Sequence, residues 1–272
     1  MSTLQELLSA GGLTRVSAEI AQVVLPSIRL KAHAVDETQL EQGATKFGGS
    51  PDLPAGYAWP EHSGSPLPFV AQLNLAEVAP YDTRHLLPVE GRLYFFFDID
   101  AFFDSWPRHQ TIWRVLFDHS VRSTLQRVAI PETVAKRNHY RPSAVTYATE
   151  MTLPDYSRYD ATSLQRIGLS APLTDEEERA YYAVQAQLAG TVGTTYHIPR
   201  HRLLGHPDDV QWDMHRELLG APPIDWHLLF QMDSDGVPGT EWGDTGRIYY
   251  WIRTRDLVKR DFSGVELILQ ST

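Results

Sequence analysis

The densest group of polar side chains that could do chemistry lies in residues 233–244. Its four carboxylates are Asp233, Asp235, Glu241 and Asp244. Asp-x-Asp-Gly is part of the calcium-binding loop of an EF-hand. When Gly236 takes position 6 of that loop, however, position 12 falls on Trp242, so the bidentate glutamate is missing. We therefore expect a loop whose carboxylates accept hydrogen bonds from its own backbone, with calcium or another ligand as the alternatives.

Two further groups have the residue types of a metal or acid–base site. Asp98 and Asp100 follow an aromatic stretch, and alternate residues of a strand share one face. A strand end that enters solvent gives the same pattern, and we favour that interpretation. His197 and His201 are four residues apart, as in zinc sites on helices, but Pro199 lies between them and the glutamate of that motif is absent.

The chain lacks the sequence motifs of the common catalytic sites. It has no Gly-x-Ser-x-Gly, no Gly-x-x-x-x-Gly-Lys loop and no Rossmann glycine fingerprint. It also has no cysteine, which excludes disulfides, thiolate-bound metals and cysteine nucleophiles. We therefore predict no catalytic residue, no metal ligand and no cofactor.

Tryptophan residues beside turns are candidates for a protein-binding surface. Trp106, Trp212 and Trp226 lie next to turn residues and could be exposed anchors of the kind that dominate protein interfaces. Most other aromatic residues, Tyr94 and Tyr249 among them, fall inside predicted strands and are expected in the core.

Three short blocks of sequence occur twice in the same order. The first copies are Gly49-Ser-Pro-Asp52, Phe69-Val-Ala-Gln72-Leu-Asn74 and Gly91-Arg-Leu-Tyr94, and the second copies are Gly205-His-Pro-Asp208, Leu228-Leu-Phe-Gln231-Met-Asp233 and Gly246-Arg-Ile-Tyr249. Three matches in one order indicate an internal duplication. We place the repeat units at about 45–100 and 201–255, with a variable insert at about 101–200.

Each repeat unit is expected to be a turn followed by two antiparallel strands. In the Gly-x-Pro-Asp turn, the aspartate (Asp52 or Asp208) can bond back to its own backbone. Gln72 and Gln231 lie in apolar strands. A buried amide must find hydrogen-bond partners, commonly backbone groups of a neighbouring loop.

Outside the repeats, the spacing of apolar residues predicts several further elements. Residues 4–25 have helical periodicity that is interrupted at Gly11 and Gly12, and residues 28–34 alternate as a strand. Strands are expected at 112–117, 125–130 and 145–148. Residues 174–177 have the pattern of a capping box, which starts a helix that ends near 189.

The charge of the chain, −10, is concentrated in the repeats. Residues 45–106 hold 3 basic and 8 acidic side chains and residues 201–272 hold 7 and 12, whereas residues 107–200 hold 11 and 9. This distribution does not favour nucleic-acid binding, and it could attract a basic partner. No signal peptide and no run of 18 apolar residues is found, so we expect a soluble cytoplasmic protein that does not bind a membrane.

The repeated blocks, together with Trp59-Pro, Gln211-Trp-Asp and Trp242-Gly-Asp244, resemble the YwqG-like family, a domain of unknown function (DUF1963). The resemblance covers about residues 45–270. It implies an α+β fold with duplicated halves and supplies no enzymatic activity or catalytic residue. Some relatives resemble neighbours of secreted toxins, which implies an immunity role for those members.

We expect one α+β body, residues 1–272, with mostly antiparallel sheets from two pseudo-symmetric halves, an N-terminal helix and a helix near 174–189. The function hypothesis is a non-catalytic protein-binding protein, most concretely an immunity-type inhibitor of a cognate secreted toxin such as a nuclease. The alternative is an enzyme or small-molecule-binding protein with a site between the halves. Candidate partner- or ligand-binding residues are Gln72, Gln231, Asp233, Asp235, Trp242 and Asp244.

Overall fold

The computed structural model describes residues 2–104, 110–156, 168–190, 192, 198–211, 214, 217–218 and 225–272. The strands are β1 (Leu25–Ala34), β2 (Lys46–Phe47), β3 (Asp52–Pro54), β4 (Glu61–His62), β5 (Ser65–Pro66), β6 (Phe69–Asn74), β7 (Arg92–Phe97), β8 (Trp113–Asp118), β9 (Leu125–Arg127), β10 (Ser143–Thr152), β11 (His201–Leu203), β12 (Trp226–Asp233), β13 (Arg247–Arg253) and β14 (Glu266–Gln270). The α-helices are α1 (Ser2–Ala10), α2 (Ser17–Val23), α3 (Leu75–Val78), α4 (Ile99–Asp104), α6 (Asp175–Leu188) and α7 (Thr254–Lys259). Short 3₁₀ turns cover Glu37–Gln39, Ala79–Tyr81, Gln110–Ile112, Arg122–Thr124 and Lys136–Asn138.

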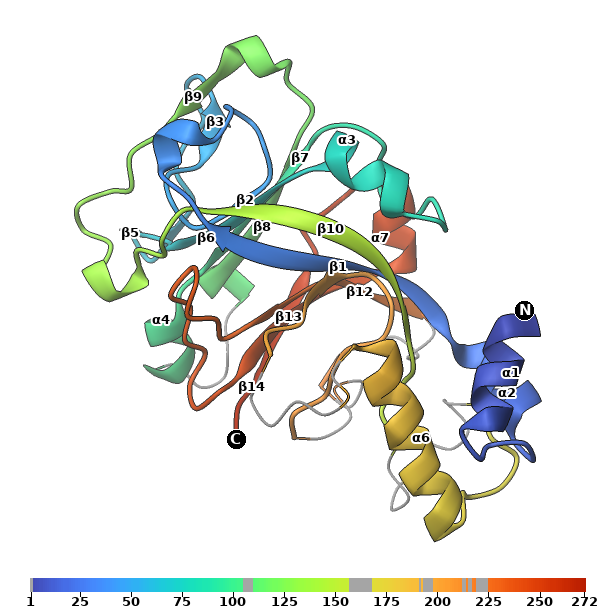
Figure 1. Ribbon diagram of the computed structural model, residues 1–272. Coiled ribbons are helices and arrows are strands. Elements are labelled where there is room, and N and C mark those ends of the chain that lie inside the picture. The colour runs from blue at the N-terminus through green and yellow to red at the C-terminus, as the bar shows by residue number, and fades with distance from the viewer. Residues whose placement is uncertain are drawn as a thin grey trace.

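One large antiparallel sheet dominates the fold (Figure 1). This agrees with the prediction of an α+β protein with mostly antiparallel strands. Its ten strands follow the order β14-β13-β12-β11-β1-β10-β2-β6-β7-β8. The long pair β1 and β10 lies near the middle, paired from Leu25 opposite Thr152 to Ala34 opposite Ser143. Strands from the first predicted repeat lie on one side of this pair and strands from the second lie on the other.

The sheet curls so that its two ends share one hydrophobic core (Figure 1). Phe95 of β7 lies with its ring centroid 4.9 Å from that of Phe230 in β12 and 4.9 Å from that of Tyr250 in β13. At the sheet edges, the Trp113 indole N–H donates to the Val265 carbonyl at 2.7 Å. The continuous apolar runs of β6, β7, β12 and β13 follow from this arrangement, because both faces of those strands are covered.

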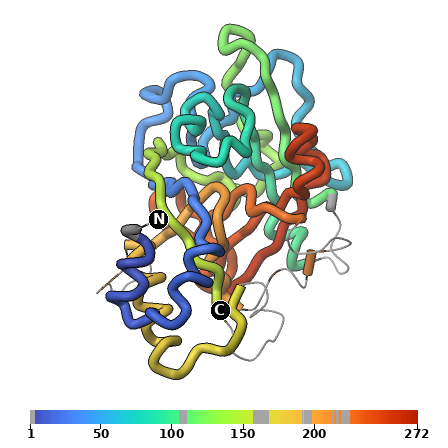
Figure 2. Tube along the Cα trace, turned by 90° about the vertical axis from the view of Figure 1, so that its right-hand side faces the viewer, coloured from blue at the N-terminus to red at the C-terminus, as the bar shows by residue number. Residues whose placement is uncertain are grey.

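A small helical layer packs at one end of the sheet. Helices α1, α2 and α6 lie together in Figure 1. In Figure 2, which is turned by 90°, the blue N-terminal segment again lies beside the yellow segment that contains α6. Their apolar faces form a separate core that includes Leu8, Ile20 and Tyr181. The predicted capping box of α6 is confirmed, since the Thr174 hydroxyl accepts from the Glu177 N–H at 3.2 Å. None of the helices in the described ranges has the length and apolar character needed to cross a membrane.

Several predicted elements differ from the observed ones. The helical segment 4–25 is two helices separated at the predicted glycines, and its last residue, Leu25, already belongs to β1. The strand expected at 145–148 is ten residues long, because β10 pairs with β1 along its whole length. The strand expected at 125–130 is only β9, which pairs with the short β3. The carboxylates after β7 lie at the start of helix α4, where the Asp98 carboxylate accepts from the Ala101 N–H at 3.0 Å.

Candidate functional site

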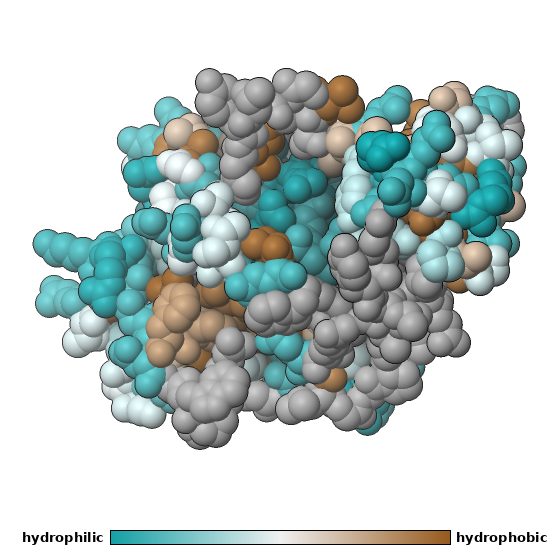
Figure 3. Space-filling view, turned by 90° about the horizontal axis from the view of Figure 1, so that it is seen from below, coloured by the Kyte–Doolittle hydropathy of each residue, from teal (hydrophilic) through white to brown (hydrophobic). Residues whose placement is uncertain are grey.

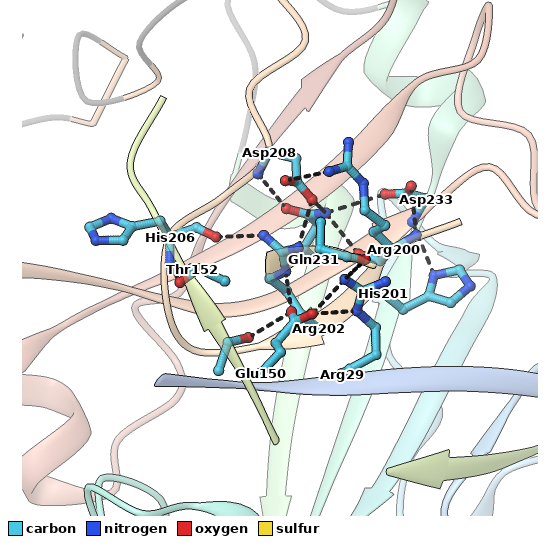
Figure 4. Close-up of polar contacts among 12 residues, drawn as sticks. Arg29, Glu150, Thr152, Arg200, His201, Arg202, His206, Asp208, Gln231 and Asp233 are labelled. Atoms are coloured by element: carbon cyan, nitrogen blue, oxygen red, sulfur yellow. Dashed lines mark hydrogen bonds and ion pairs between the residues drawn. The ribbon is translucent and has the colours of Figure 1, made fainter. Parts of the chain in front are cut away.

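The Gln231 amide is the centre of a buried polar network between β11 and β12 (Figure 4). Its Oε1 accepts from the Asp208 backbone N–H at 2.9 Å. Its Nε2 donates to the Arg200 carbonyl at 2.8 Å and to Asp208 Oδ2 at 3.1 Å. The side chain is fully buried, and its partners belong to the loops that flank β11. The prediction that this glutamine is buried and bonded to neighbouring loops is confirmed.

Arg202 extends the network toward the central strands. Its side chain is only 2% exposed and forms ion pairs with Glu150 Oε1 at 2.9 Å and Asp208 Oδ2 at 2.9 Å. Arg29 donates from Nε to the other Glu150 oxygen at 2.7 Å, and Arg200 pairs with Asp208 Oδ1 at 3.1 Å. Burial alone would raise the pKa of the Asp208 carboxyl, but the neighbouring arginines, Arg202 first, bring that pKa below its ordinary value.

The first predicted repeat contains a network with the same pattern of contacts. Gln72 Oε1 accepts from the Asp52 N–H at 2.8 Å, and its Nε2 donates to the Ala44 carbonyl at 2.7 Å and to Asp52 Oδ2 at 3.0 Å. Lys46, opposite Gln72 in the sheet, pairs with Asp52 Oδ2 at 3.1 Å. Arg202 stands opposite its glutamine in the same way.

The strand tyrosines complete the correspondence between the two networks. The Tyr94 hydroxyl donates to the Asp52 carbonyl at 2.6 Å, and the Tyr249 hydroxyl donates to the Asp208 carbonyl at 2.6 Å. Lys46 and Asp52 are both fully buried, and burial lowers the pKa of the Lys46 ammonium.

The expectation that the aspartates of the Gly-x-Pro-Asp blocks bond back to their own turns is wrong. The carboxylate of Asp52 instead accepts from the Gly43 N–H at 3.0 Å and from Arg127 Nε at 2.8 Å. Each of these aspartates faces a buried cation on a neighbouring strand, and an ion pair there satisfies two buried charges at once.

The segment 233–244, between β12 and β13, divides between the interior and the surface. Asp233 is fully buried and pairs with Arg247 Nε at 2.8 Å. Asp235 accepts from the Val237 N–H at 2.8 Å, so this carboxylate does bond to the backbone of its own loop, and its other oxygen contacts His201 Nε2 at 2.9 Å. Only Asp244 among the named candidates in this loop is exposed.

The two candidate tryptophans that the structure describes are both buried. Trp242 is fully buried and donates its indole N–H to the Asp233 carbonyl at 3.2 Å. The expectation that Trp226 is exposed is wrong: it is 5% exposed because it packs in a core cluster with the Arg253 guanidinium 4.8 Å from its ring centroid. Trp106 and Trp212 lie outside the described residues, as does His197.

A hollow of about 490 Å³ lies where α4, the 137–140 segment and the 239–244 loop meet. It is lined by Ile99, Asp100, Phe103, Arg137, Asn138, Tyr140, Gly239, Glu241, Gly243 and Asp244. Asp100 is held in place, since its Oδ2 accepts from Arg137 at 2.7 Å and from the Asn138 amide at 2.9 Å. Figure 1 shows α4 and the β12–β13 loop on the same side of the molecule.

The hollow brings together some of the predicted site residues and leaves others elsewhere. Of the candidate partner- or ligand-binding residues, Asp244 lines it, whereas Gln72, Gln231 and Asp233 are enclosed in the two networks. Tyr140 and Arg137 were not predicted, because they come from the predicted insert and only the fold places them beside the 239–244 loop. In the ranges that the structure covers, no three His, Asp or Glu side chains come together to hold a metal ion.

The face of the molecule that is seen from below is mixed in polarity. Seen from below, hydrophilic side chains predominate and the hydrophobic ones form separate small patches (Figure 3).

Comparison with the curated proteins gives no match. Residues 45–271, most of the chain, match a family described as a domain of unknown function (DUF1963). The chain therefore belongs to the DUF1963 family.

Proposed function

We propose that this chain is a non-catalytic protein-binding protein that takes a basic partner at the hollow between α4 and the 239–244 loop. An immunity-type inhibitor of a cognate secreted toxin, such as a nuclease, is the concrete case. The observation that carries the proposal is the composition of the hollow. Three carboxylates line it, those of Asp100, Glu241 and Asp244, against the single cation of Arg137.

The charge of the whole chain supports a basic partner. Its net charge is −10, and long-range attraction between complementary charges raises association rates. A nuclease has a basic cleft for its substrate, so an acidic inhibitor can occupy that cleft by charge complementarity.

An enzyme or small-molecule-binding protein is the second candidate function. The observation that favours it is the size of the hollow, because about 490 Å³ lies in the range of sites that enclose a small molecule. The two candidate functions predict different experimental results. A protein partner stays bound as a stoichiometric complex, whereas a small molecule raises the melting temperature of the isolated chain.

The test is a pull-down with the tagged full-length chain from its native cell, with the product of the neighbouring gene supplied in excess. A one-to-one complex that weakens with salt supports the proposal. The double variant Glu241→Gln/Asp244→Asn should weaken the complex. The matched control Glu90→Gln/Glu176→Gln removes two exposed charges away from the hollow and should not. Failure to retain any partner, together with stabilisation by a small molecule, would reverse the order of the two functions.

We further infer that the two halves arose by duplication, are related by pseudo-symmetry and fold as one cytoplasmic body. Support comes from the matched glutamine–aspartate contacts and from the single core to which β7, β12 and β13 all contribute. A single cooperative unfolding transition followed by both fluorescence and circular dichroism is expected. Two separate transitions would contradict the single body.

A further inference from the structure

Tyr140 has an unusual position in the wall of the hollow. Its side chain is 5% exposed and packs against Trp242, with the ring centroids 5.3 Å apart. Its hydroxyl has no hydrogen-bond partner among the residues that the structure describes. Burial raises the pKa of this hydroxyl, and the carboxylates of Asp100 and Asp98 raise it further, so it stays protonated. Because Tyr140 lines the hollow, this hydroxyl can form a hydrogen bond with a group that enters it.

The other groups in the hollow suit a cation. Glu241 and Asp244 are exposed and form no ion pair among the described residues. Phe103 is 60% exposed although it is a large aromatic residue, and its ring lies beside Gly243, where an added Cβ would be 3.7 Å from the ring. An exposed aromatic ring near carboxylates that form no ion pair can attract a cation through its π-face.

Hydrogen bonds from Arg141 fix the position of the residues just before Glu241 and Asp244. Arg141 donates its backbone N–H to the Pro238 carbonyl at 2.7 Å and its Nε to the Val237 carbonyl at 3.0 Å. A prearranged site loses less conformational entropy on binding than a flexible one.

We propose that the hollow binds one arginine side chain of the partner protein. This inference rests on the proposed function and names the group that the hollow recognises. The guanidinium has five N–H donors in one plane. These donors can reach the Glu241 and Asp244 carboxylates and the Tyr140 oxygen, while the guanidinium face stacks on Phe103. A lysine ammonium, which is a compact point charge, cannot make the same planar set of contacts.

The test uses N-acetyl-arginine methylamide as the probe. Its binding to the full-length ¹⁵N-labelled chain is monitored by NMR. Millimolar probe should shift the amide signals of Gly239, Glu241 and Gly243 in a saturable way. The neutral analogue N-acetyl-citrulline methylamide should shift them at least about 10-fold less strongly at the same concentration. The lysine analogue should bind more weakly than the arginine probe.

Variants of the residues that line the hollow test which side chains contact the probe. Glu241→Gln/Asp244→Asn should weaken binding about 10-fold or more, and Tyr140→Phe about 2- to 10-fold. Tyr140→Phe removes only the unpartnered hydroxyl, so the protein should remain fully folded. The control Glu90→Gln/Glu176→Gln should bind the probe as the unmodified chain does. Equal binding of the citrulline analogue, or unchanged binding by Glu241→Gln/Asp244→Asn, would overturn the arginine site.

The outcomes also separate this inference from the proposed function. A partner protein that is retained equally well by the Glu241→Gln/Asp244→Asn variant would overturn the arginine site and the hollow as the binding surface, and would leave only protein binding elsewhere on the chain. Specific binding of the arginine probe without any retained protein would support the site and contradict the protein-binding function.

Discussion

Replacing Gln231 with leucine tests whether the buried network holds the fold together. Leucine is close in size to glutamine but has no polar atoms, so Gln231→Leu removes every hydrogen bond that the amide makes. Two backbone groups then lose their partner, the Asp208 N–H and the Arg200 carbonyl. The Asp208 carboxylate keeps its ion pair with Arg202.

The size of the effect follows from those two groups. An unsatisfied buried donor or acceptor costs about 1–3 kcal/mol, so Gln231→Leu should lower the free energy of unfolding by about 2–6 kcal/mol. A typical domain is stable by only about 5–15 kcal/mol, so the loss should be large. Gln72→Leu should cost a similar amount, because Gln72 makes the corresponding contacts with Asp52 and Ala44.

Urea unfolding followed by tryptophan fluorescence measures this loss. Gln126→Leu is the matched control, since Gln126 lies in β9 but is exposed, and it should leave the midpoint almost unchanged. A Gln231→Leu protein whose free energy of unfolding is within about 0.5 kcal/mol of the unmodified chain would refute the argument.

Three further predictions concern the ion pairs and the shared core. Asp208→Asn removes one of the two carboxylates that pair with buried Arg202, together with the carboxylate that pairs with Arg200, and should cost about 3–5 kcal/mol at pH 7. Because the folded-state pKa of Asp208 is lowered, the stability it contributes is present above the unfolded pKa of about 3.9 and is lost below it, so urea midpoints of the two proteins should converge in acid. The hydrogen bond from Arg15, followed by that from the Thr174 N–H, lowers the pKa of Glu177 to about 2, and Arg15→Met should raise that pKa in an NMR titration. Phe95→Ala should cost about 3–5 kcal/mol and keep a single calorimetric transition, whereas a second transition would contradict the shared core.

Local patterns in the sequence predict the elements whose stability is local. The capping box of α6 is visible as Thr174 and Glu177, three residues apart, and both of its hydrogen bonds form. The break between α1 and α2 follows from Gly11 and Gly12. The burial of Gln231 follows from the apolar residues on both sides of it, since a polar side chain within such a strand must be satisfied internally.

Features that depend on distant pairing could not be predicted in the same way. The length of β10 depends on its pairing with β1, more than 100 residues earlier in the chain. The buried partner of Asp52 is Lys46, and the strand pairing that places Lys46 opposite Gln72 is set by the sheet. Before that pairing is known, the sequence of a Gly-x-Pro-Asp block indicates only a turn. The role expected for the aspartate was wrong for this reason.

The hollow lies where the two predicted repeat units differ, and this difference indicates where a binding function should be sought. The paired residues that recur in both units, such as Gln72 and Gln231, make matching internal contacts. The connection after the glutamine strand does not recur: in the first unit it forms α3, and in the second it forms the loop that carries Glu241 and Asp244. We expect residues that hold the fold together to tolerate few changes in either predicted unit, whereas surface loops commonly carry binding residues. Substitutions in the networks should therefore act mainly on stability, and substitutions around the hollow mainly on binding.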